Sequence, residues 1–173
     1  MKWFKAWSMT LIALAAVGCG GVKTADLSPD RLPEPFEVAQ DMHDEPSSRV
    51  ARYVVDGEGM LNYGGGHHAL VRDPKPIGRL TDAERLELWR IIHRHGLMAA
   101  SGAMFKSADQ TLYRAKLTAA GQSHRFRAVD DEVAGLSALN DALYRMYSER
   151  RYEDVIRPIE SEIERHEGNV PRQ

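Results

Sequence analysis

Twice along this chain, two alternating stretches joined by a turn precede a helical pattern, and this order constrains the fold more than any other feature. Residues 49–55 alternate in polarity, Asp56-Gly57 is a two-residue hairpin signal, and residues 59–63 form the expected returning strand. Residues 111–118 and 123–129 make a second hairpin pattern. The order ββ-α-ββ-α predicts an α+β fold, in which an antiparallel sheet packs its helices on one face.

The first predicted helix has well-marked ends. Thr81 and Glu84 make a capping box, in which each side chain satisfies the free backbone amide of the other residue. Gly96 ends the pattern, directly after Arg94 and His95, whose positive charge favours the last turn of a helix. The apolar arc between these ends contains Leu86, Leu88, Trp89, Ile91 and Ile92.

The second helix is predicted over about residues 131–149, where apolar side chains recur at helical spacing. Residues 49–149 are therefore expected to form the globular domain. Residues 150–173 are predicted to be a C-terminal helical extension and tail. Pro158 lies inside this extension and should kink the helix or start a new turn, since proline lacks a backbone N–H.

The start of the chain has the pattern of a secretory signal peptide. Lys2 and Lys5 precede a mostly apolar run over residues 6–17, and small residues follow it. This run is too short to span a bilayer, which needs about 20 residues as a helix. The signal peptide is predicted over residues 1–18.

Residues 14–19, with the sequence Leu-Ala-Ala-Val-Gly-Cys, resemble the lipobox of bacterial lipoproteins. The resemblance implies that the thiol of Cys19 carries diacylglycerol, that cleavage occurs before it, and that the new N-terminus receives an acyl chain such as palmitate. Ala16 stands where the family usually has leucine. Gly20, in place of Asp, implies outer-membrane sorting in a Gram-negative cell envelope. The alternative is a free thiol in a discarded signal peptide that is cut further along.

Cys19 is the only cysteine of the chain, so it has no intramolecular disulfide partner. Two or three acyl chains give a lasting membrane anchor where one chain is marginal. Residues 19–48 would then be the lipidated N-terminus and an acidic, proline-rich, disordered tether. This segment holds four of the eight prolines, and it has seven acidic side chains against two basic ones.

Composition limits the classes of partner. The formal net charge is −2, and 43% of the residues are hydrophobic, which suits a globular domain. A strongly basic domain, the usual sign of nucleic-acid binding, is not present in this sequence. We therefore expect no nucleic-acid partner.

The order of elements over about residues 50–147 supports a second resemblance. The run from Val54 to Gly65, the triplet Arg79-Leu80-Thr81 and the stop at Gly96-Leu97 resemble an uncharacterised domain of bacterial lipoproteins. The order is also similar to that of emfourin, a small inhibitor of protealysin. The resemblance implies the fold and brings no catalytic residue with it.

The histidines do not suggest a metal site. His93 and His95 are two residues apart on a helix, so their side chains project in nearly opposite directions. His67 and His68 would face opposite ways on a strand. A site that joins one of them to His124 or to an aspartate across the sheet is the alternative, but the sequence selects no third ligand.

Other motifs also lack the context that their chemistry needs. Residues 64–66 are three glycines without the following Lys and Ser/Thr of a P-loop, and they predict a bend or bulge. Ser101 and Ser123 have no nucleophile-elbow context. We therefore predict no catalytic residue, no metal and no cofactor, so the protein is not expected to be an enzyme. An enzyme whose site the sequence does not reveal remains a third hypothesis.

Four basic residues on the second hairpin form a candidate binding surface. Arg114 and Lys116 on one strand, and Arg125 and Arg127 on the next, alternate with apolar residues and so share a face. They are either a solvated sheet face balanced by Asp56, Glu58 or Asp130, or a docking surface for an anionic partner. Such a partner would be an acidic envelope protein, the phosphates of lipopolysaccharide or another polyanion.

Together these patterns predict a membrane-anchored lipoprotein of the cell envelope, facing the periplasm or the cell exterior. Its leading predicted role is that of a non-catalytic binding module. The alternative, suggested by the order of elements, is an inhibitor of an envelope or secreted protease.

Overall fold

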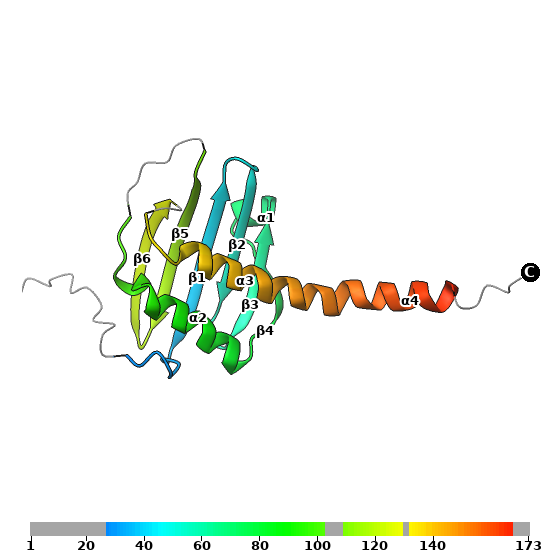
Figure 1. Cartoon of the computed structure of the whole chain (residues 1–173), viewed down its shortest axis with the longest axis horizontal. Coiled ribbons are helices and arrows are strands. Elements are labelled where there is room, and N and C mark those ends of the chain that lie inside the picture. Colours follow the sequence, from blue (N-terminus) through cyan, green and yellow to red (C-terminus); the bar gives the residue numbers. More distant parts are fainter. Residues whose placement is uncertain (1–26, 103–108, 130–131, 168–173) are drawn as a thin grey trace, which may run out of the picture.

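The structure is a computed structural model that describes residues 27–102, 109–129 and 132–167. These residues form a six-stranded antiparallel sheet with the strand order β4-β3-β2-β1-β5-β6 (Figure 1). The predicted α+β fold is confirmed. The strands are β1 Phe36–Asp44, β2 Arg49–Val55, β3 Met60–Gly65, β4 Lys75–Arg79, β5 Thr111–Ala119 and β6 Gln122–Val129.

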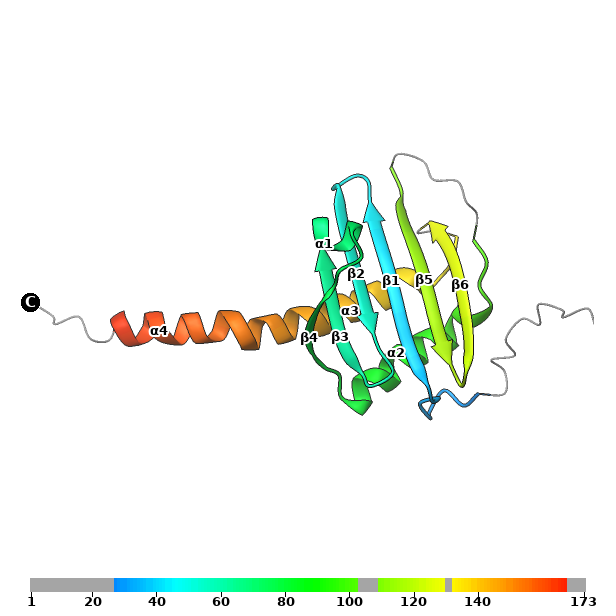
Figure 2. The same cartoon turned by 180° about the vertical axis from the view of Figure 1, so that it is seen from behind.

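Two long helices cover one face of the sheet. They are α2 Asp82–Arg94 and α3 Leu136–Arg151, and they lie side by side across the strands (Figure 1). We call the opposite face the open face; among the described helices, only the short α1 His67–Leu70 lies against it (Figure 2). The remaining elements are a 3₁₀ turn η2 Leu97–Ala99, a π turn η3 Tyr152–Ile156 and α4 Arg157–Glu167.

The sequence signals at the ends of α2 correspond to real caps. The Thr81 side chain accepts a hydrogen bond from the backbone N–H of Glu84 at 3.3 Å, and the Thr81 N–H donates to the Glu84 carboxylate at 2.7 Å. Gly96 follows the C-cap with a φ of 61°. This left-handed conformation suits glycine and ends the helix.

The second hairpin has the predicted pairing. Thr111 to Ala119 pair with Gln122 to Val129 across a two-residue turn. Ala120 and Gly121 both have positive φ, which is the geometry of tight hairpin turns. The first hairpin turn is longer than predicted, because β2 ends at Val55 and β3 begins at Met60.

The prediction of a disordered tether over residues 19–48 is wrong for its C-terminal part. Residues 36–44 form β1, which lies inside the sheet and pairs with β2 on one side and β5 on the other. Leu27 and Leu32 pack against the core, and the Trp89 indole donates to the Ser28 carbonyl at 2.9 Å. The domain therefore begins well before residue 49, and residues 19–26 lie outside the described residues.

Charged residues on the outward face of β1 explain why the sequence pattern of this segment does not predict a strand. Phe36, Val38 and Gln40 are buried beneath the helices, whereas Glu37 and Asp41 alternate with them on the open face. The acids make the segment look like a linker. In the sheet, the Asp41 carboxylate accepts a hydrogen bond from Arg52 of β2 at 2.5 Å.

The region between β3 and α2 also differs from the prediction. His67 and His68, considered above on a strand, lie in α1, and residues 75–79 form β4, a strand that the sequence patterns do not predict. Proline generally disfavours a strand because it lacks a backbone N–H. Pro76 is tolerated in β4 because β4 is an edge strand of the sheet.

The helical extension predicted after residue 150 continues α3. The chain passes through η3 into α4, which projects beyond the sheet (Figures 1 and 2). The π turn directly precedes Arg157 and Pro158, because proline cannot supply the N–H of a regular α-helical bond. No helix among the described residues is long and apolar enough to cross a membrane.

One hydrophobic core lies between the sheet and the two long helices. The helices contribute their apolar sides, and the sheet contributes the inward residues of every second position. The largest fully buried side chains are Trp89, Phe36, Leu61, Leu88, Ile92, Leu97, Met98, Leu117, Leu136, Leu139, Leu143 and Met146.

Candidate functional site

The four basic residues selected from the sequence come together on the open face. Arg114 of β5 lies directly opposite Arg127 of β6, and Lys116 lies opposite Arg125. The three arginines are exposed and the lysine is half-buried. We call these four residues the cationic patch.

Two acids of β1 lie beside the cationic patch: Glu37 is near Lys116, and Asp41 is directly opposite Arg114 in the sheet register. Among the described residues, Arg114, Arg125 and Arg127 form no ion pair. Lys116 has its Nζ 4.0 Å from the Glu37 carboxylate, at the limit of an ion pair between exposed groups. Like charges directly opposite one another on neighbouring strands destabilise a sheet. An anionic partner would remove this repulsion.

If the four basic residues were only a solvated sheet face, nearby acids would have to balance their charge. The acids that the sequence offers for this role lie in another part of the sheet or outside the described residues. Asp56 accepts hydrogen bonds from the backbone of Glu58 and Met60 in the β2–β3 turn, and Glu58 pairs with Arg79 at 3.5 Å. Strand β1 separates that hairpin from β5. Asp130 lies outside the described residues.

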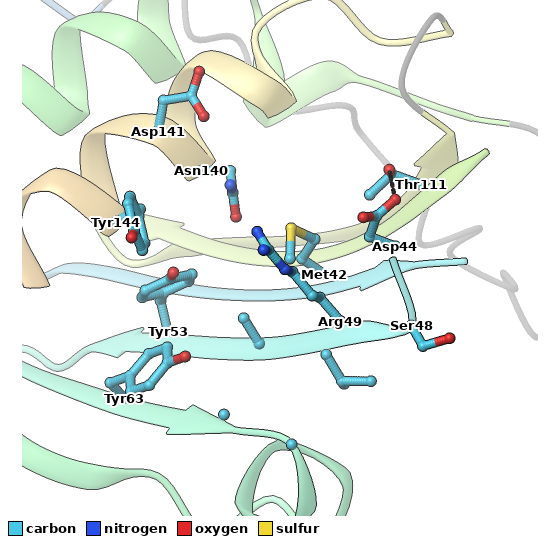
Figure 3. A pocket seen from close by; sticks show the side chains of 14 residues that line it. Met42, Asp44, Ser48, Arg49, Tyr53, Tyr63, Thr111, Asn140, Asp141 and Tyr144 are labelled. Carbon is cyan, nitrogen blue, oxygen red and sulfur yellow. Dashed lines mark hydrogen bonds between the residues drawn. The ribbon is translucent and has the colours of Figure 1, made fainter. Parts of the chain in front are cut away.

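The structure also contains a hollow that the sequence did not suggest. It has a volume of about 600 Å³ and lies on the helix-covered side of the sheet, between α3 and strands β1, β2, β3 and β5 (Figure 3). Tyrosine rings line one end, and Arg49, Asp44 and Thr111 lie toward the other. We call it the tyrosine hollow.

A cluster of tyrosine rings in contact forms the aromatic end of the tyrosine hollow. The ring centroids of Tyr53 and Tyr63 are 5.2 Å apart, and the ring of Tyr63 stacks on Tyr147 of α3 at 3.9 Å. Tyr144 lies next to Tyr147, at 6.3 Å. Gly65 makes room for this arrangement, because a Cβ there would lie 2.6 Å from the Tyr63 hydroxyl.

Three polar groups of the tyrosine hollow, Tyr53, Tyr63 and Asp44, have shifted pKa values. Burial raises the pKa of Tyr53 well above its usual range, and it also raises that of Tyr63. Both phenols are therefore hydrogen-bond donors at neutral pH. Hydrogen bonds from Ser47 and Thr111 lower the pKa of Asp44, so this carboxylate is ionised.

Part of this site had a signal in the sequence. Tyr53 and Tyr63 face each other across the first hairpin, so a correct register would have paired them. The hollow is completed by three residues of α3, Asn140, Asp141 and Tyr144. They are distant in sequence from the strands, and local patterns do not predict their position.

The histidines are not gathered at one site. The ring of His93 contacts Trp89 with centroids 5.6 Å apart, and His95 is the C-cap of α2. His124 forms a 2.7 Å hydrogen bond with the Ala100 carbonyl oxygen, and its ring stacks on Phe126. His68 lies near Asp73 at 3.8 Å. Within the described ranges, no group of three His, Cys, Asp or Glu residues is placed to hold a metal ion.

Comparisons with protein-family models, with curated proteins and with solved structures find no match to this chain. Lipidation at Cys19 and the similarity to emfourin therefore stay predictions. Cys19 and Gly20 lie outside the described residues.

Proposed function

We propose that this chain is a lipid-anchored module of the bacterial cell envelope that binds an acidic partner protein and catalyses no reaction. The N-terminal pattern, with Cys19 as the lipidated residue and Gly20 after it, supports an anchor in the outer membrane. The cationic patch supports the binding role.

The single observation that carries the binding role is the pairing of Arg114 with Arg127 and of Lys116 with Arg125 on the open face of the sheet. Neighbouring strands lie about 4.8 Å apart, and alternate residues of a strand about 7 Å apart. The four charges therefore form a compact cluster. An arginine guanidinium binds a carboxylate with two parallel hydrogen bonds, which suits an acidic protein segment.

The surroundings of the cationic patch favour a protein over a dense polyanion. Glu37 and Asp41 of β1 lie on the same face, directly beside β5. They would repel the closely spaced phosphates of lipopolysaccharide. A protein segment can place its own acids over β5 and β6 and its neutral or basic residues over β1.

A binding assay with a matched control tests the proposal. A fluorescein-labelled peptide of eight glutamates is titrated with the full mature chain in detergent, and its anisotropy is followed. We expect saturable, salt-sensitive binding that weakens at least about tenfold in the variant Arg125→Gln/Arg127→Gln. The control, Arg90→Gln/Arg94→Gln on α2, makes the same change in net charge on the opposite side of the sheet.

Equal weakening in the two variants would mean that net charge alone attracts the peptide, and this outcome contradicts the proposal. Binding of lipopolysaccharide at the patch without binding of the peptide would also contradict it, because the partner would then be a phosphate-bearing lipid.

A further inference from the structure

The tyrosine hollow lies on the opposite side of the sheet from the cationic patch, and the proposed function does not use it. Its volume of about 600 Å³ is within the range of small-molecule sites in proteins. Figure 3 shows that strands of the sheet form its floor and that α3 forms one wall.

Aromatic faces make one end of the hollow suitable for a flat ligand. Tyr53 and Tyr63 are tilted by 43° to each other, and Tyr144 of α3 lies close to them in Figure 3. Tyr144 is 56% exposed, so part of its ring is free of protein contacts. A ring that enters between these side chains gains stacked or edge-to-face contacts.

A cation lies farther along the hollow. The Arg49 side chain extends over the strands toward Asn140, and its guanidinium lies among the lining residues (Figure 3). Among the described residues, the Arg49 side chain forms no hydrogen bond or ion pair, although its charge helps to lower the pKa of the Asp44 carboxyl. The nearby Asp44 carboxylate already accepts hydrogen bonds from the hydroxyls of Ser47 and Thr111. Arg49 is therefore available to an anionic group of a ligand.

Two further polar atoms in the hollow lack protein partners. The Tyr53 residue is only 2% exposed, and its hydroxyl oxygen, which is not among the fully buried atoms, makes no hydrogen bond within the described part of the chain. The Oδ1 atom of Asn140 is buried and has no hydrogen-bond partner either. Buried polar groups are normally paired, so the unpaired Asn140 Oδ1 at the hollow offers an acceptor for a hydrogen-bond donor of a ligand or for a water molecule.

We infer that the tyrosine hollow binds a small planar ligand with one anionic group, of the aromatic carboxylate class. The ring lies among Tyr53, Tyr63 and Tyr144, and the carboxylate lies against Arg49. Asp44 and Asp141 also line the hollow, and their charge disfavours ligands with several negative groups.

A pair of probes that differ mainly in charge tests this inference. Indole-3-acetate and its neutral analogue indole-3-acetamide are titrated separately into the full mature chain, and backbone amide shifts are followed by NMR. We expect saturable shifts on β2, β3 and α3, with the acid binding about tenfold tighter than the amide. Arg49→Gln should abolish this preference, and Arg49→Lys should restore part of it.

Tyr144→Ala should weaken both probes, because the aromatic wall holds the ring in each case. The matched controls are Tyr152→Ala, which removes an exposed tyrosine beyond the hollow, and Arg125→Gln on the open face; neither should change either affinity. Arg49 and Tyr144 are exposed, so the folded state should survive both substitutions, and the amide spectrum of each variant verifies this.

Three outcomes would overturn the inference. One is equal binding of the acid and the amide by the unmodified chain. Another is an unchanged preference for the acid in a folded Arg49→Gln variant. The third is the absence of saturation with either probe up to about 10 mM.

Discussion

Glu84 of α2 and Arg150 of α3 form a two-pronged ion pair that joins the two long helices. Arg150 donates from Nη1 to Glu84 Oε1 at 2.9 Å and from Nη2 to Oε2 at 2.7 Å. The same carboxylate accepts the backbone N–H of Thr81, and Arg150 also donates to the carbonyls of Met146 and Arg79. One pair therefore holds the start of α2, the end of α3 and the edge strand β4.

Glu84→Gln should destabilise the domain by about 1.5–3 kcal/mol, because it removes the charge partner of a largely buried arginine and weakens the helix cap. The side chains of Arg150 and Glu84 are 17% and 19% exposed. Urea unfolding followed by circular dichroism measures the change. Glu87→Gln is the matched control, since Glu87 pairs with Arg145 at the surface and its loss should cost under about 1 kcal/mol.

The Glu84–Arg150 pair should also make stability depend on pH. Hydrogen bonds from Arg150 lower the pKa of Glu84 from 4.5 to about 2 in the folded chain. As the pH falls below about 5, the unfolded chain takes up this proton first, so the stabilisation is present above that range and is lost toward pH 2. The difference in unfolding free energy between the unmodified chain and Glu84→Gln should therefore shrink steadily from pH 6 to pH 3. A difference that stays constant over this range would contradict the assignment.

Gly65→Ala should disturb the tyrosine hollow. The added Cβ would lie 2.6 Å from the Tyr63 hydroxyl, and the Tyr63 ring is held by stacking on Tyr147. We expect a loss of about 1–3 kcal/mol of stability from this overpacking, together with weaker binding of indole-3-acetate. Gly57→Ala is the control, because the nearest atom to its added Cβ is 3.7 Å away. Equal stability of the two variants would show that Tyr63 is free to move.

Helix α4 should contribute little to the stability of the domain. It projects beyond the sheet, and its described apolar side chain Ile159 is 53% exposed (Figure 1). An isolated helix of this length is marginal in water. Truncation after Ile156 should therefore change the unfolding free energy by less than about 0.5 kcal/mol. A loss above about 1 kcal/mol would mean that α4 supports the core.

The anchor prediction has its own test. Intact-mass analysis of the membrane-fraction protein should find a chain that starts at Cys19 and carries the added mass of its acyl chains. The Cys19→Ala variant should lack this mass and leave the membrane fraction. An unmodified chain cut at another position would contradict lipidation.

Local chemistry explains which parts of the fold the sequence could predict. The capping box at Thr81 and the glycine stop at Gly96 act within a few residues, and both are present in the structure. The shared face of Arg114 and Arg127 followed from the two-residue period of strands and a short turn.

The failures of sequence prediction also have physical causes. Strand β1 has the polar Gln40 at its buried centre, and the Gln40 Nε2 atom donates to the Leu136 carbonyl at 3.1 Å, a partner 96 residues away. Burial of this amide depends on α3, so no local pattern indicates it. The tyrosine hollow and the Glu84–Arg150 pair likewise need two distant elements to be packed together.

Photo-crosslinking in living cells can determine whether β5 and β6 bind an acidic protein partner in the cell envelope, as proposed above. A photoreactive amino acid is placed at Arg125 in one strain and at Arg94, on the other side of the sheet, in a second. We expect a discrete adduct with an acidic envelope protein from position 125 that disappears with Arg114→Glu, and no such adduct from position 94. The same adducts from both positions would contradict the proposal. So would the absence of any adduct from position 125 in protein that has reached the membrane.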